Sequence, residues 1–283
     1  MSKILLTGSS GFIGSNLLEN FSKNNEITLV VRKNVKKNIK SNKNIKIIKF
    51  NDYDELHYKL KKIKIDIVIH CATHYVKNHN YKDIDKLIES NILLGNIILE
   101  NIKIMKVKKF INFSTVWEGN FKINGFINLY SSYKKAFSSI LNYYKITNPQ
   151  TKFLELMLSD TYGSNDQRQK LINILRKNYQ KNITTRISSK NLYLNLLNVE
   201  DIVSAVEKIL NIKIKPGKFV LKNNRNYKVF DIIKFLNKQS KKKIKIMWNS
   251  NILIKNKIFN YDELKGWSPK KSKINDIINL ITK

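Results

Sequence analysis

Cysteine is almost absent from this 283-residue sequence, in which Cys71 stands alone. One cysteine excludes an intramolecular disulfide and a metal site built from thiolates. We expect no metal site, and we expect Cys71 to be a small buried residue at the end of a strand. The sequence also lacks any run of about 18 or more apolar residues, and it lacks the basic start and apolar block of a signal peptide. These absences favour a cytoplasmic protein without a membrane partner.

Arginine is scarce as well, although the chain is strongly basic. Lysine and arginine number 53 against 21 acidic residues, which gives a formal charge of +32, and only five of the 53 are arginine. Nucleic-acid binders concentrate cations in patches and interleave them with aromatic residues, whereas these lysines are spread along the whole chain. We therefore expect no nucleic-acid partner, and we expect the charge to help attract an anionic substrate.

Apolar runs alternate with helical patterns in the first half of the chain. After the N-terminal run, strands are expected at Glu26–Arg32, Ile45–Phe50, Asp66–His70 and Lys109–Ser114, with helices near Asp54–Lys62, Asp83–Met105 and Tyr130–Tyr144. The 42% hydrophobic content is sufficient for one large core with a lobe attached. The alternation predicts an α/β fold with a Rossmann-like, doubly wound parallel sheet and right-handed crossovers.

The pattern becomes irregular after residue 150. Further strands are expected at Thr151–Leu158, Leu192–Val199, Lys218–Leu221 and Lys243–Trp248, with helices at Arg168–Tyr179, Glu200–Leu210, Tyr227–Lys238 and after Lys273. We expect residues 1–158 to form the Rossmann domain, with residues 191–221 returning to it. Residues 159–190 and 222–283 would then form a small mixed α/β C-terminal lobe that binds the substrate.

A glycine cluster directly follows the first apolar run. Gly8, Gly11 and Gly14 lie three residues apart in the segment Thr7-Gly-Ser-Ser-Gly-Phe-Ile-Gly14, where an amphipathic pattern begins. Gly8 would make the tight turn off the strand, and Gly11 would let the backbone approach a pyrophosphate. Gly14 would let the helix lie close to the sheet, with its N-terminal amides directed at the anion. The spacing therefore predicts a dinucleotide site.

Two residues one helical turn apart, Tyr130 and Lys134, are candidates for acid–base chemistry. At this spacing both side chains project from the same helical face. A nearby cation favours the ionised phenol, so Tyr130 would exchange a proton with a carbonyl or carbinol oxygen near neutral pH. Tyr133 is a competing tyrosine, but Phe137 rather than lysine stands four residues after it. Thr115 ends the preceding strand, at the sheet edge where ligands bind in open α/β folds.

These motifs resemble the extended short-chain dehydrogenase/reductases, the NAD(P)-dependent family that modifies sugars carried on nucleotides. His70-Cys-Ala72, Asn198-Val-Glu-Asp201 and Leu264-Lys-Gly-Trp-Ser-Pro269 match further family segments in the same order. The resemblance implies an NAD(P)-binding Rossmann domain, catalytic roles for Thr115, Tyr130 and Lys134, and a homodimer formed through the helices near 83–105 and 130–144. The cofactor-binding residues that it implies are Gly8, Ser10, Gly11, Phe12, Ile13, Gly14, Arg32, Asp52, Ala72, Asn91, Tyr130 and Lys134.

The choice of dinucleotide depends on Arg32, which closes the second strand. NAD-specific folds place a carboxylate there to hold the ribose 2′-hydroxyl, whereas a cation accommodates the 2′-phosphate of NADP. Lys33 and Lys36 follow closely. The sequence therefore favours NADP(H), with NAD(H) as the other possibility.

Departures from the family pattern narrow the reaction. The family's dehydratases have Thr-Asp-Glu where this chain has Thr115-Val-Trp117, so the acid and base that remove water are missing from those two positions. Leu194 replaces the arginine that usually faces the substrate diphosphate, and other cations would have to replace it. The substrate-binding residues that we expect are His74, Tyr75, Thr115 and Trp117 around the sugar, with Arg168, Lys170 and Arg186 for the diphosphate.

These features favour an NAD(P)H-dependent 4-ketoreductase acting on a nucleotide-linked deoxyhexose. The segment Cys71-Ala-Thr-His-Tyr75, the short chain and Arg32 are most similar to the CDP-abequose and CDP-paratose synthases of O-antigen pathways. A nucleotide-sugar 4-epimerase would use the same three residues with tightly held NAD. A redox-sensing dinucleotide-binding regulator is the non-enzyme alternative, and the intact Tyr130–Lys134 pair argues against it.

Overall fold

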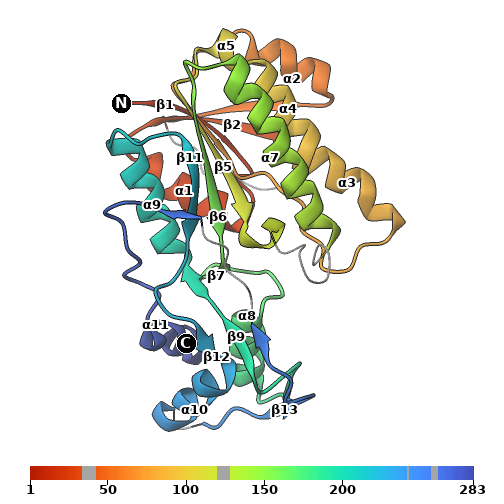
Figure 1. Ribbon diagram of the computed structural model, residues 1–283, viewed down its shortest axis with the longest axis vertical. Helices are drawn as coiled ribbons and strands as arrows, with labels where there is room; N and C mark the ends of the chain where they lie inside the picture. Colours follow the sequence, from red (N-terminus) through yellow and green to blue (C-terminus); the bar gives the residue numbers. More distant parts are fainter. Residues whose placement is uncertain (34–42, 120–127, 241, 256–260) are drawn as a thin grey trace. The chain divides into compact units, whose positions relative to one another are not determined.

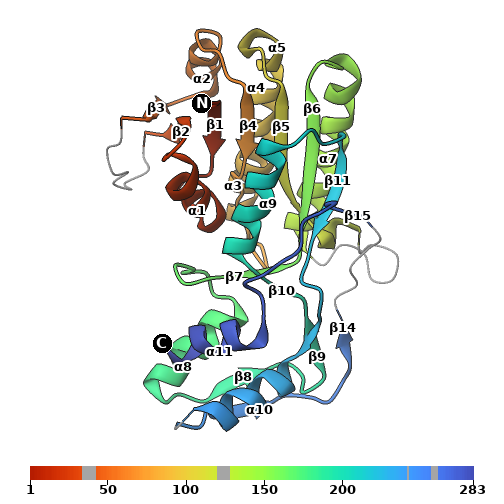
Figure 2. The ribbon, with the colours of Figure 1, turned by 90° about the vertical axis from the view of Figure 1, so that its left-hand side faces the viewer.

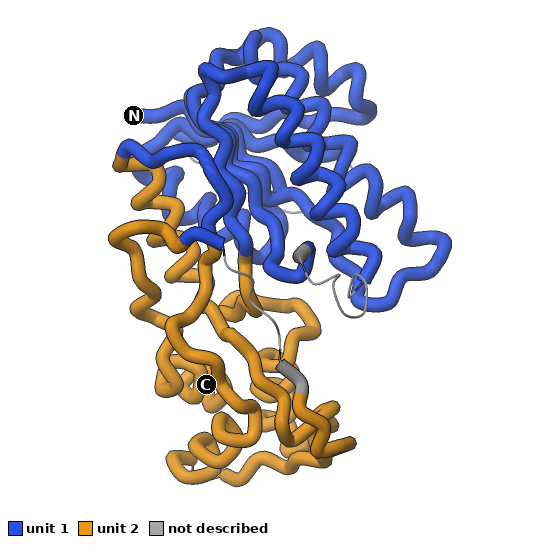
Figure 3. The backbone as a smooth tube through the Cα atoms, in the orientation of Figure 1, with its two compact units in different colours: residues 1–157, 213–219, 259–262 blue, residues 158–212, 220–258, 263–283 orange. Residues whose placement is uncertain are grey.

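The structure is a computed structural model that describes residues 1–33, 43–119, 128–240, 242–255 and 261–283 (Figure 1). The chain divides into two compact units, coloured separately in Figure 3. Unit 1 comprises residues 1–157, 213–219 and 259–262, and unit 2 comprises residues 158–212, 220–258 and 263–283. Of residues 191–221, which were expected to return to the Rossmann domain, residues 213–219 belong to unit 1, and residues 191–212 and 220–221 belong to unit 2. The functional roles assigned to the two parts stay predictions.

The central sheet has eight strands in the order β15-β11-β6-β5-β4-β1-β2-β3. Neighbours β1 and β2, β1 and β4, β2 and β3, and β4 and β5 run parallel. This sheet confirms the predicted Rossmann-like, doubly wound α/β architecture. The strand bounds are Lys3–Thr7 (β1), Glu26–Arg32 (β2), Ile45–Phe50 (β3), Ile67–His70 (β4), Lys109–Thr115 (β5), Lys152–Leu158 (β6), Gly217–Leu221 (β11) and Asp262–Glu263 (β15).

Helices of unit 1 lie on both faces of the sheet (Figures 1 and 2). The helix α1 (Phe12–Phe21) lies on one face, and α2 (Tyr53–Leu60), α4 (Leu94–Glu100) and α7 (Leu129–Thr147) lie on the other. Under the second group, Leu5, Val68 and Phe110 stand side by side on neighbouring strands. They pack with Ile98 and Leu141 in one buried core. The apolar strands were predictable because parallel strands covered on both faces read as nearly continuous hydrophobic runs.

The expected long helix over 83–105 is interrupted. A 3₁₀ turn (Tyr81–Asp83) and α3 (Ile84–Ile88) lead into a π-helical turn at Glu89–Leu93, and α4 and α5 (Ile102–Met105) follow. A π-helical turn inserts one residue into the helical repeat and changes which side chains share a face, and such turns occur often at functional sites. The turn here contains Glu89 and Asn91.

Unit 2 is a small mixed α/β unit that includes the segments expected to form the C-terminal lobe. Its helices are α8 (Leu171–Lys181), α9 (Val199–Asn211), α10 (Val229–Gln239) and α11 (Ile274–Thr282). Short strands pair as β10 (Leu196–Asn198) with β7 (Asp160–Tyr162), β13 (Ile246–Trp248) with β8 (Thr185–Ile187), and β9 (Leu192–Leu194) with β12 (Tyr227–Lys228) and β14 (Ile254–Lys255). Leu175, Leu236 and Ile281 are fully buried in its core. Among the described residues, no helix is both long enough and apolar enough to cross a membrane.

Several elements of unit 2 differ from the expected bounds, and two of these differences coincide with side-chain hydrogen bonds. The single strand expected over 192–199 is divided at Asn195, whose side chain donates to the carbonyl oxygen of Asn223 and accepts from its N–H. The helix α8 begins at Leu171 rather than Arg168, because the Arg168 side chain and N–H both bind Asp166 in the preceding turn. Side-chain bonds to the backbone thus override the strand and helix patterns at these points.

Candidate active site

The glycine segment has the backbone geometry that the spacing predicted. Gly8 has a φ of +70°, and its carbonyl oxygen accepts a 2.9 Å hydrogen bond from the Gly11 N–H. A Cβ on Gly8 would lie 2.6 Å from the Ala72 nitrogen, and a Cβ on Gly14 would lie 2.2 Å from the Gly8 oxygen. The turn therefore approaches β4 and α1 so closely that side chains are excluded at both positions. Its role in holding a pyrophosphate, with Ser10, Phe12 and Ile13, stays a prediction.

The ends of β1 and β4 are joined beside this turn. The Thr7 hydroxyl lies 3.0 Å from His70 Nδ1 and accepts a 3.1 Å hydrogen bond from the Ala72 N–H. Burial, followed by the nearby Lys134 charge, lowers the pKa of His70 to about 3, so this imidazole is neutral. Cys71 stands at the expected strand end but is partly exposed rather than buried.

The helix α7 brings Tyr130 and Lys134 to the carboxyl end of β5. Lys134 is only 3% exposed, its Nζ donates a 2.9 Å hydrogen bond to the Phe113 carbonyl, and it lies 5.8 Å from the centre of the Tyr130 ring. Burial lowers the pKa of Lys134 to about 8, against an opposing effect of Cys71 and Glu118. Thr115 is buried two residues beyond Phe113, and its hydroxyl accepts a 3.3 Å hydrogen bond from the Trp117 N–H. This arrangement can move a proton at the Tyr130 hydroxyl with a cation close behind it.

Two of the aromatic residues expected around the sugar gather at Tyr130. The Tyr75 ring meets the Tyr130 ring edge-to-face, with centroids 5.1 Å apart, and its centroid lies 6.4 Å from that of Trp117. His74 precedes Tyr75, and its buried Nε2 makes no hydrogen bond to the described residues. The structure thus forms an aromatic wall at the candidate catalytic tyrosine from segments after β4 and β5.

Asn91 was expected to contact the cofactor, but its buried amide binds the protein. The side chain donates to the carbonyl oxygens of His74 and Leu87 and accepts a 2.6 Å hydrogen bond from the Thr73 hydroxyl. These bonds fix the segment after β4 against the π-helical turn. Asn91 therefore holds the segment that leads into Tyr75, and a direct contact of Asn91 with the cofactor stays a prediction.

Arg32 lies at the end of β2 in an ion pair that the sequence did not reveal. Its Nη1 lies 2.7 Å from Glu89 Oε2, and its Nη2 donates a 2.7 Å hydrogen bond to the Tyr53 hydroxyl. Burial acts to lower the pKa of Arg32, but the Glu89 and Tyr53 interactions outweigh it and the net direction is upward. A cavity of about 190 Å³ lies here, lined by Arg32, Lys33, Phe50, Asn51, Tyr53 and Glu89. Lys36 lies outside the described residues.

This cavity and the glycine turn suit a dinucleotide. The turn ends at Gly11, the N-cap residue of α1, which has no side chain, and a helix N-terminus favours an anion. The cavity follows the ends of β2 and β3, where Rossmann folds hold the adenosine ribose. Asp52, expected at the adenine, accepts a 2.8 Å hydrogen bond from the Glu55 N–H and so caps α2. Its contact with the cofactor stays a prediction.

The three cations proposed for the substrate diphosphate all lie in unit 2. Arg168 binds the buried carboxylate of Asp166, with 2.7 Å between Nε and Oδ1, and donates to the Thr161 carbonyl. Lys170 is the N-cap residue of α8, and Arg186 is exposed on β8. The strong pairing of Arg168 points to a structural role for it, and the diphosphate contacts of all three stay predictions.

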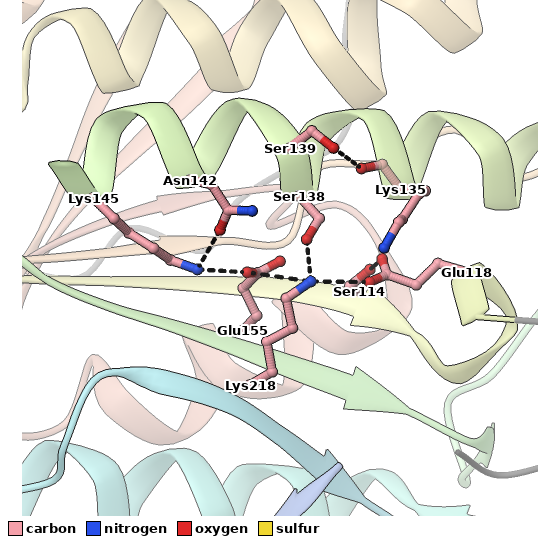
Figure 4. Close-up of polar contacts among 9 residues, drawn as sticks. All are labelled: Ser114, Glu118, Lys135, Ser138, Ser139, Asn142, Lys145, Glu155 and Lys218. Atoms are coloured by element: carbon pink, nitrogen blue, oxygen red, sulfur yellow. Dashed lines mark hydrogen bonds and ion pairs between the residues drawn. The ribbon is translucent and has the colours of Figure 1, made fainter. Parts of the chain in front are cut away.

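A buried ionic cluster under α7 was missed from the sequence (Figure 4). Glu118 accepts a 2.5 Å hydrogen bond from Ser114 and lies 3.3 Å from the ammonium of Lys218. The same ammonium lies 3.6 Å from Glu155, which also pairs with Lys145 at 2.9 Å. Both glutamate side chains are fully buried, and burial raises the pKa of Glu118 against the opposing effects of Ser114 and Lys218. The sequence held one signal of this cluster: Glu118 and Glu155 each lie next to or within an apolar segment, where a carboxylate needs a partner.

Comparison with known families identifies the class of the protein. The NAD dependent epimerase/dehydratase family model matches residues 4–221, which is most of the chain. The protein belongs to this family and is an NAD-dependent enzyme of its oxidoreductase and epimerase class. No group of three or more His, Cys, Asp or Glu side chains in the described part of the chain is arranged to hold a metal ion.

Individual relatives agree with this assignment. CDP-abequose synthase of Yersinia pseudotuberculosis is 29% identical over 206 residues, which is 72% of this chain and 71% of the relative. The enzyme of the same name from Salmonella muenchen is 25% identical over 237 residues, which is 82% and 80% of the two chains.

Solved structures show the same fold. UDP-glucuronic acid 4-epimerase of Bacillus cereus, in complex with UDP-glucuronic acid and NAD, has a TM-score of 0.78 at 21% identity and covers 98% of this chain and 99% of its own. UDP-glucose 4-epimerase of Thermus thermophilus, in complex with NAD, has a TM-score of 0.77 at 17% identity and covers 98% and 97%. At these identities the comparison establishes the fold alone.

Proposed function

We propose that the protein is an NAD(P)H-dependent 4-ketoreductase that acts on a nucleotide-linked deoxyhexose in surface polysaccharide biosynthesis. The observation that carries the proposal is the Tyr130–Lys134 pair beside Thr115, at a site where Val116 and Trp117 stand in place of a dehydratase's acid and base. The two CDP-abequose synthase relatives support the substrate class and its place in O-antigen synthesis.

In this reaction each residue has a distinct task. The bound dinucleotide supplies the hydride that reduces the ring carbonyl. Tyr130 gives its phenolic proton to the resulting alkoxide, and the Lys134 cation stabilises the phenolate that remains. Thr115 orients the substrate oxygen, and Tyr75 and Trp117 cover the site and limit the access of water. The buried Lys134 ammonium needs a fixed acceptor, and the Phe113 carbonyl is that acceptor.

The cofactor and the assembly are further parts of the proposal. Arg32 supports NADPH, because a guanidinium at the end of β2 attracts the 2′-phosphate. Exposed apolar side chains support a homodimer through the helices near 83–105 and 130–144: Ile88 and Ile104 on the first and Tyr143 on the second. We place the dimer in the cytoplasm, where sugar nucleotides are made.

The main alternative is a nucleotide-sugar 4-epimerase, which would use the same Thr115, Tyr130 and Lys134. The two enzymes differ in how they use the dinucleotide. A reductase must exchange NADP for NADPH at every turnover, whereas an epimerase ends the cycle with the NAD with which it began. The decisive experiment is to mix purified protein, 4-keto sugar nucleotides and NADPH, and to follow the absorbance of the reduced nicotinamide.

A reductase consumes NADPH in a one-to-one ratio with product, and only when the 4-keto sugar nucleotide is present. Mass spectrometry of the product should show a gain of two hydrogens. Protein that carries a full complement of NAD and interconverts saturated sugar nucleotides without added dinucleotide is an epimerase, and this result would replace the proposal.

A further inference from the structure

Arg32 is held by partners from two separate elements. Tyr53, the first residue of α2, binds Nη2, and Glu89, the first residue of the π-helical turn, binds Nη1. Glu89 follows Arg32 by 57 residues. The three side chains lie together on the wall of the 190 Å³ cavity. A carboxylate thus stands at the end of β2, although the residue in that position of the sequence is an arginine.

Tyr53 supports the Arg32–Glu89 pair from one side. The Tyr53 ring packs against Phe50 with centroids 5.7 Å apart, and the guanidinium carbon of Arg32 lies 5.8 Å from the centre of the same ring. The Tyr53 hydroxyl also lies 3.4 Å from the main-chain oxygen of Glu89. The side chains of Arg32 and Glu89 are 38% and 37% exposed. They are therefore supported from behind and remain accessible to a ligand in the cavity.

A carboxylate and a guanidinium in contact act in opposite ways on a ribose. The carboxylate accepts a hydrogen bond from a 2′-hydroxyl, and it repels a 2′-phosphate that carries up to two negative charges. The guanidinium attracts the phosphate, but Glu89 already occupies its Nη1 at 2.7 Å. A phosphate that binds Arg32 must therefore displace Glu89 or approach its charge closely.

We infer that Glu89 is a specificity-determining residue for the dinucleotide: it favours the free 2′-hydroxyl of NAD(H) and limits the advantage that Arg32 gives to NADP(H). The inference deepens the proposed function, because it rests on the cavity as the adenosine-ribose site. It does not depend on whether the enzyme reduces or epimerises its substrate.

The test measures binding without catalysis. ADP-ribose and 2′-phospho-ADP-ribose are titrated by calorimetry into the full-length protein, after removal of any bound dinucleotide and with no sugar nucleotide present. The change is Glu89→Gln, which keeps the size and removes the charge. Affinity for 2′-phospho-ADP-ribose should rise about tenfold, because a like charge beside the phosphate is gone. Affinity for ADP-ribose should stay equal or fall.

Matched variants separate this effect from a general change of charge. Glu100→Gln removes another carboxylate from the same helical segment, where Glu100 binds Tyr144 instead of Arg32. It should leave the ratio of the two affinities unchanged. In a protein that already carries Arg32→Gln, Glu89→Gln should raise the affinity for 2′-phospho-ADP-ribose by less, because the Arg32 cation that the loss of Glu89 would free is absent. Thermal melting confirms that each variant is folded.

An unchanged affinity ratio in Glu89→Gln overturns the inference. So does an equal gain in Glu100→Gln, because the effect would then be non-specific. Failure of every variant to bind either fragment would show that the cavity is not the ribose site. Failure of the reductase assay with the affinity ratio shifted as expected would overturn the proposed reaction and leave the role of Glu89 intact.

Discussion

Lys134 donates a 2.9 Å hydrogen bond from its ammonium to the Phe113 carbonyl, and this bond ties α7 to β5. Phe113 is two residues before Thr115, so the bond links the helix that carries Tyr130 to the strand end that carries Thr115. The hydrogen bond to the Phe113 carbonyl oxygen therefore helps to hold Tyr130 and Thr115, the two proposed substrate contacts, in position relative to each other. This bond does not involve the side chains of Tyr130 and Thr115, so replacing either side chain should affect turnover more than folding. The first prediction tests this for Tyr130.

Replacing Tyr130 by phenylalanine should remove the proton donor and little else. Turnover should fall about 10²–10⁴-fold, the range typical of a lost acid–base group, while dinucleotide affinity stays near normal. Initial rates and calorimetric titration measure the two quantities. Tyr133→Phe is the control, and its turnover should be close to that of the unchanged protein. The opposite ranking of the two variants would transfer the role to Tyr133.

The dependence of activity on pH should reflect the titration of the buried Lys134. Burial lowers the pKa of Lys134 to about 8 from an ordinary value of 10.5, so the native protein loses this proton before the unfolded chain does. Between these values the unfolded state binds more protons, and the contribution of Lys134 to the free energy of unfolding rises with pH. The cation beside Tyr130 is lost over the same range. Activity should therefore fall above pH 8 without a loss of stability from this group.

The arginine variant of the same residue provides the comparison. Lys134→Arg keeps its charge at all accessible pH values, so its activity, although lower, should show no decline centred near pH 8. Rates of both proteins from pH 6 to 10 test this. Identical profiles for the two would exclude Lys134 as the group that titrates.

Charge reversal at Arg32 should change cofactor affinity. Arg32→Asp removes a cation from the proposed 2′-phosphate site and places a second carboxylate beside Glu89. We expect NADPH binding to weaken by about 1.5–3 kcal/mol, the scale of a hydrogen bond to a charged group, with NADH relatively favoured. Titration of both dinucleotides measures this. Tighter binding of NADH than NADPH by the unchanged protein would contradict the assignment.

Two glycines of the turn should differ in their tolerance of a methyl group. In Gly14→Ala the new Cβ would lie 2.2 Å from the Gly8 oxygen, so α1 must move away from the turn. In Gly11→Ala the corresponding distance is 3.2 Å, which a small shift accommodates. Urea unfolding should show a loss of about 2 kcal/mol or more for Gly14→Ala and a smaller one for Gly11→Ala. Equal losses of unfolding free energy in the two variants would contradict the prediction, because α1 would then move away from the turn at little cost.

The buried ionic cluster should depend strongly on Lys218. Lys218→Met leaves the buried Glu118 without its cation, and breaking a buried pair on one side costs about 3–5 kcal/mol. Lys222→Met is the control, because its partner Glu263 is exposed and such a pair contributes about 0–1 kcal/mol. Urea unfolding of both variants compares the two losses.

The loss of unfolding free energy in Lys218→Met should also depend on pH. Burial raises the pKa of Glu118, so the native carboxyl holds its proton to a higher pH than the unfolded one. The stability from such a group is complete below the ordinary pKa and is lost as the pH rises through the native value. Without Lys218 the native pKa rises further, and the loss of stability should be larger at pH 8 than at pH 5. A deficit that is the same at both values would mean that Glu118 is not the group left unpaired.

Local patterns account for the parts of the fold and site that the sequence predicted. The glycine spacing, the Tyr130–Lys134 pair and the apolar strands each involve residues within one turn or one strand, so their geometry follows from the period of the element. The sheet and its parallel order followed from the alternation of these elements. Tyr75 and Trp117 were expected around the sugar, and in the structure the Tyr75 ring meets the rings of both Tyr130 and Trp117.

Pairings between distant residues account for what the sequence did not reveal. Glu89 meets Arg32 across 57 residues, and Lys218 meets Glu118 across 100. Neither pair has a local signature, and the many lysines of this chain make any one of them look like a surface residue.

The cluster under α7 has a consequence for synthesis on the ribosome. Glu118 and Glu155 emerge early, but the strand β11 that carries Lys218 follows β6 only after residues 158–212 of unit 2 have been made. Until then the nascent sheet has two glutamates to bury and lacks one of the ammonium groups that neutralise them. We expect the first 157 residues, released alone, to remain incompletely folded, because the sheet can bury both glutamates only once β11 has added beside β6.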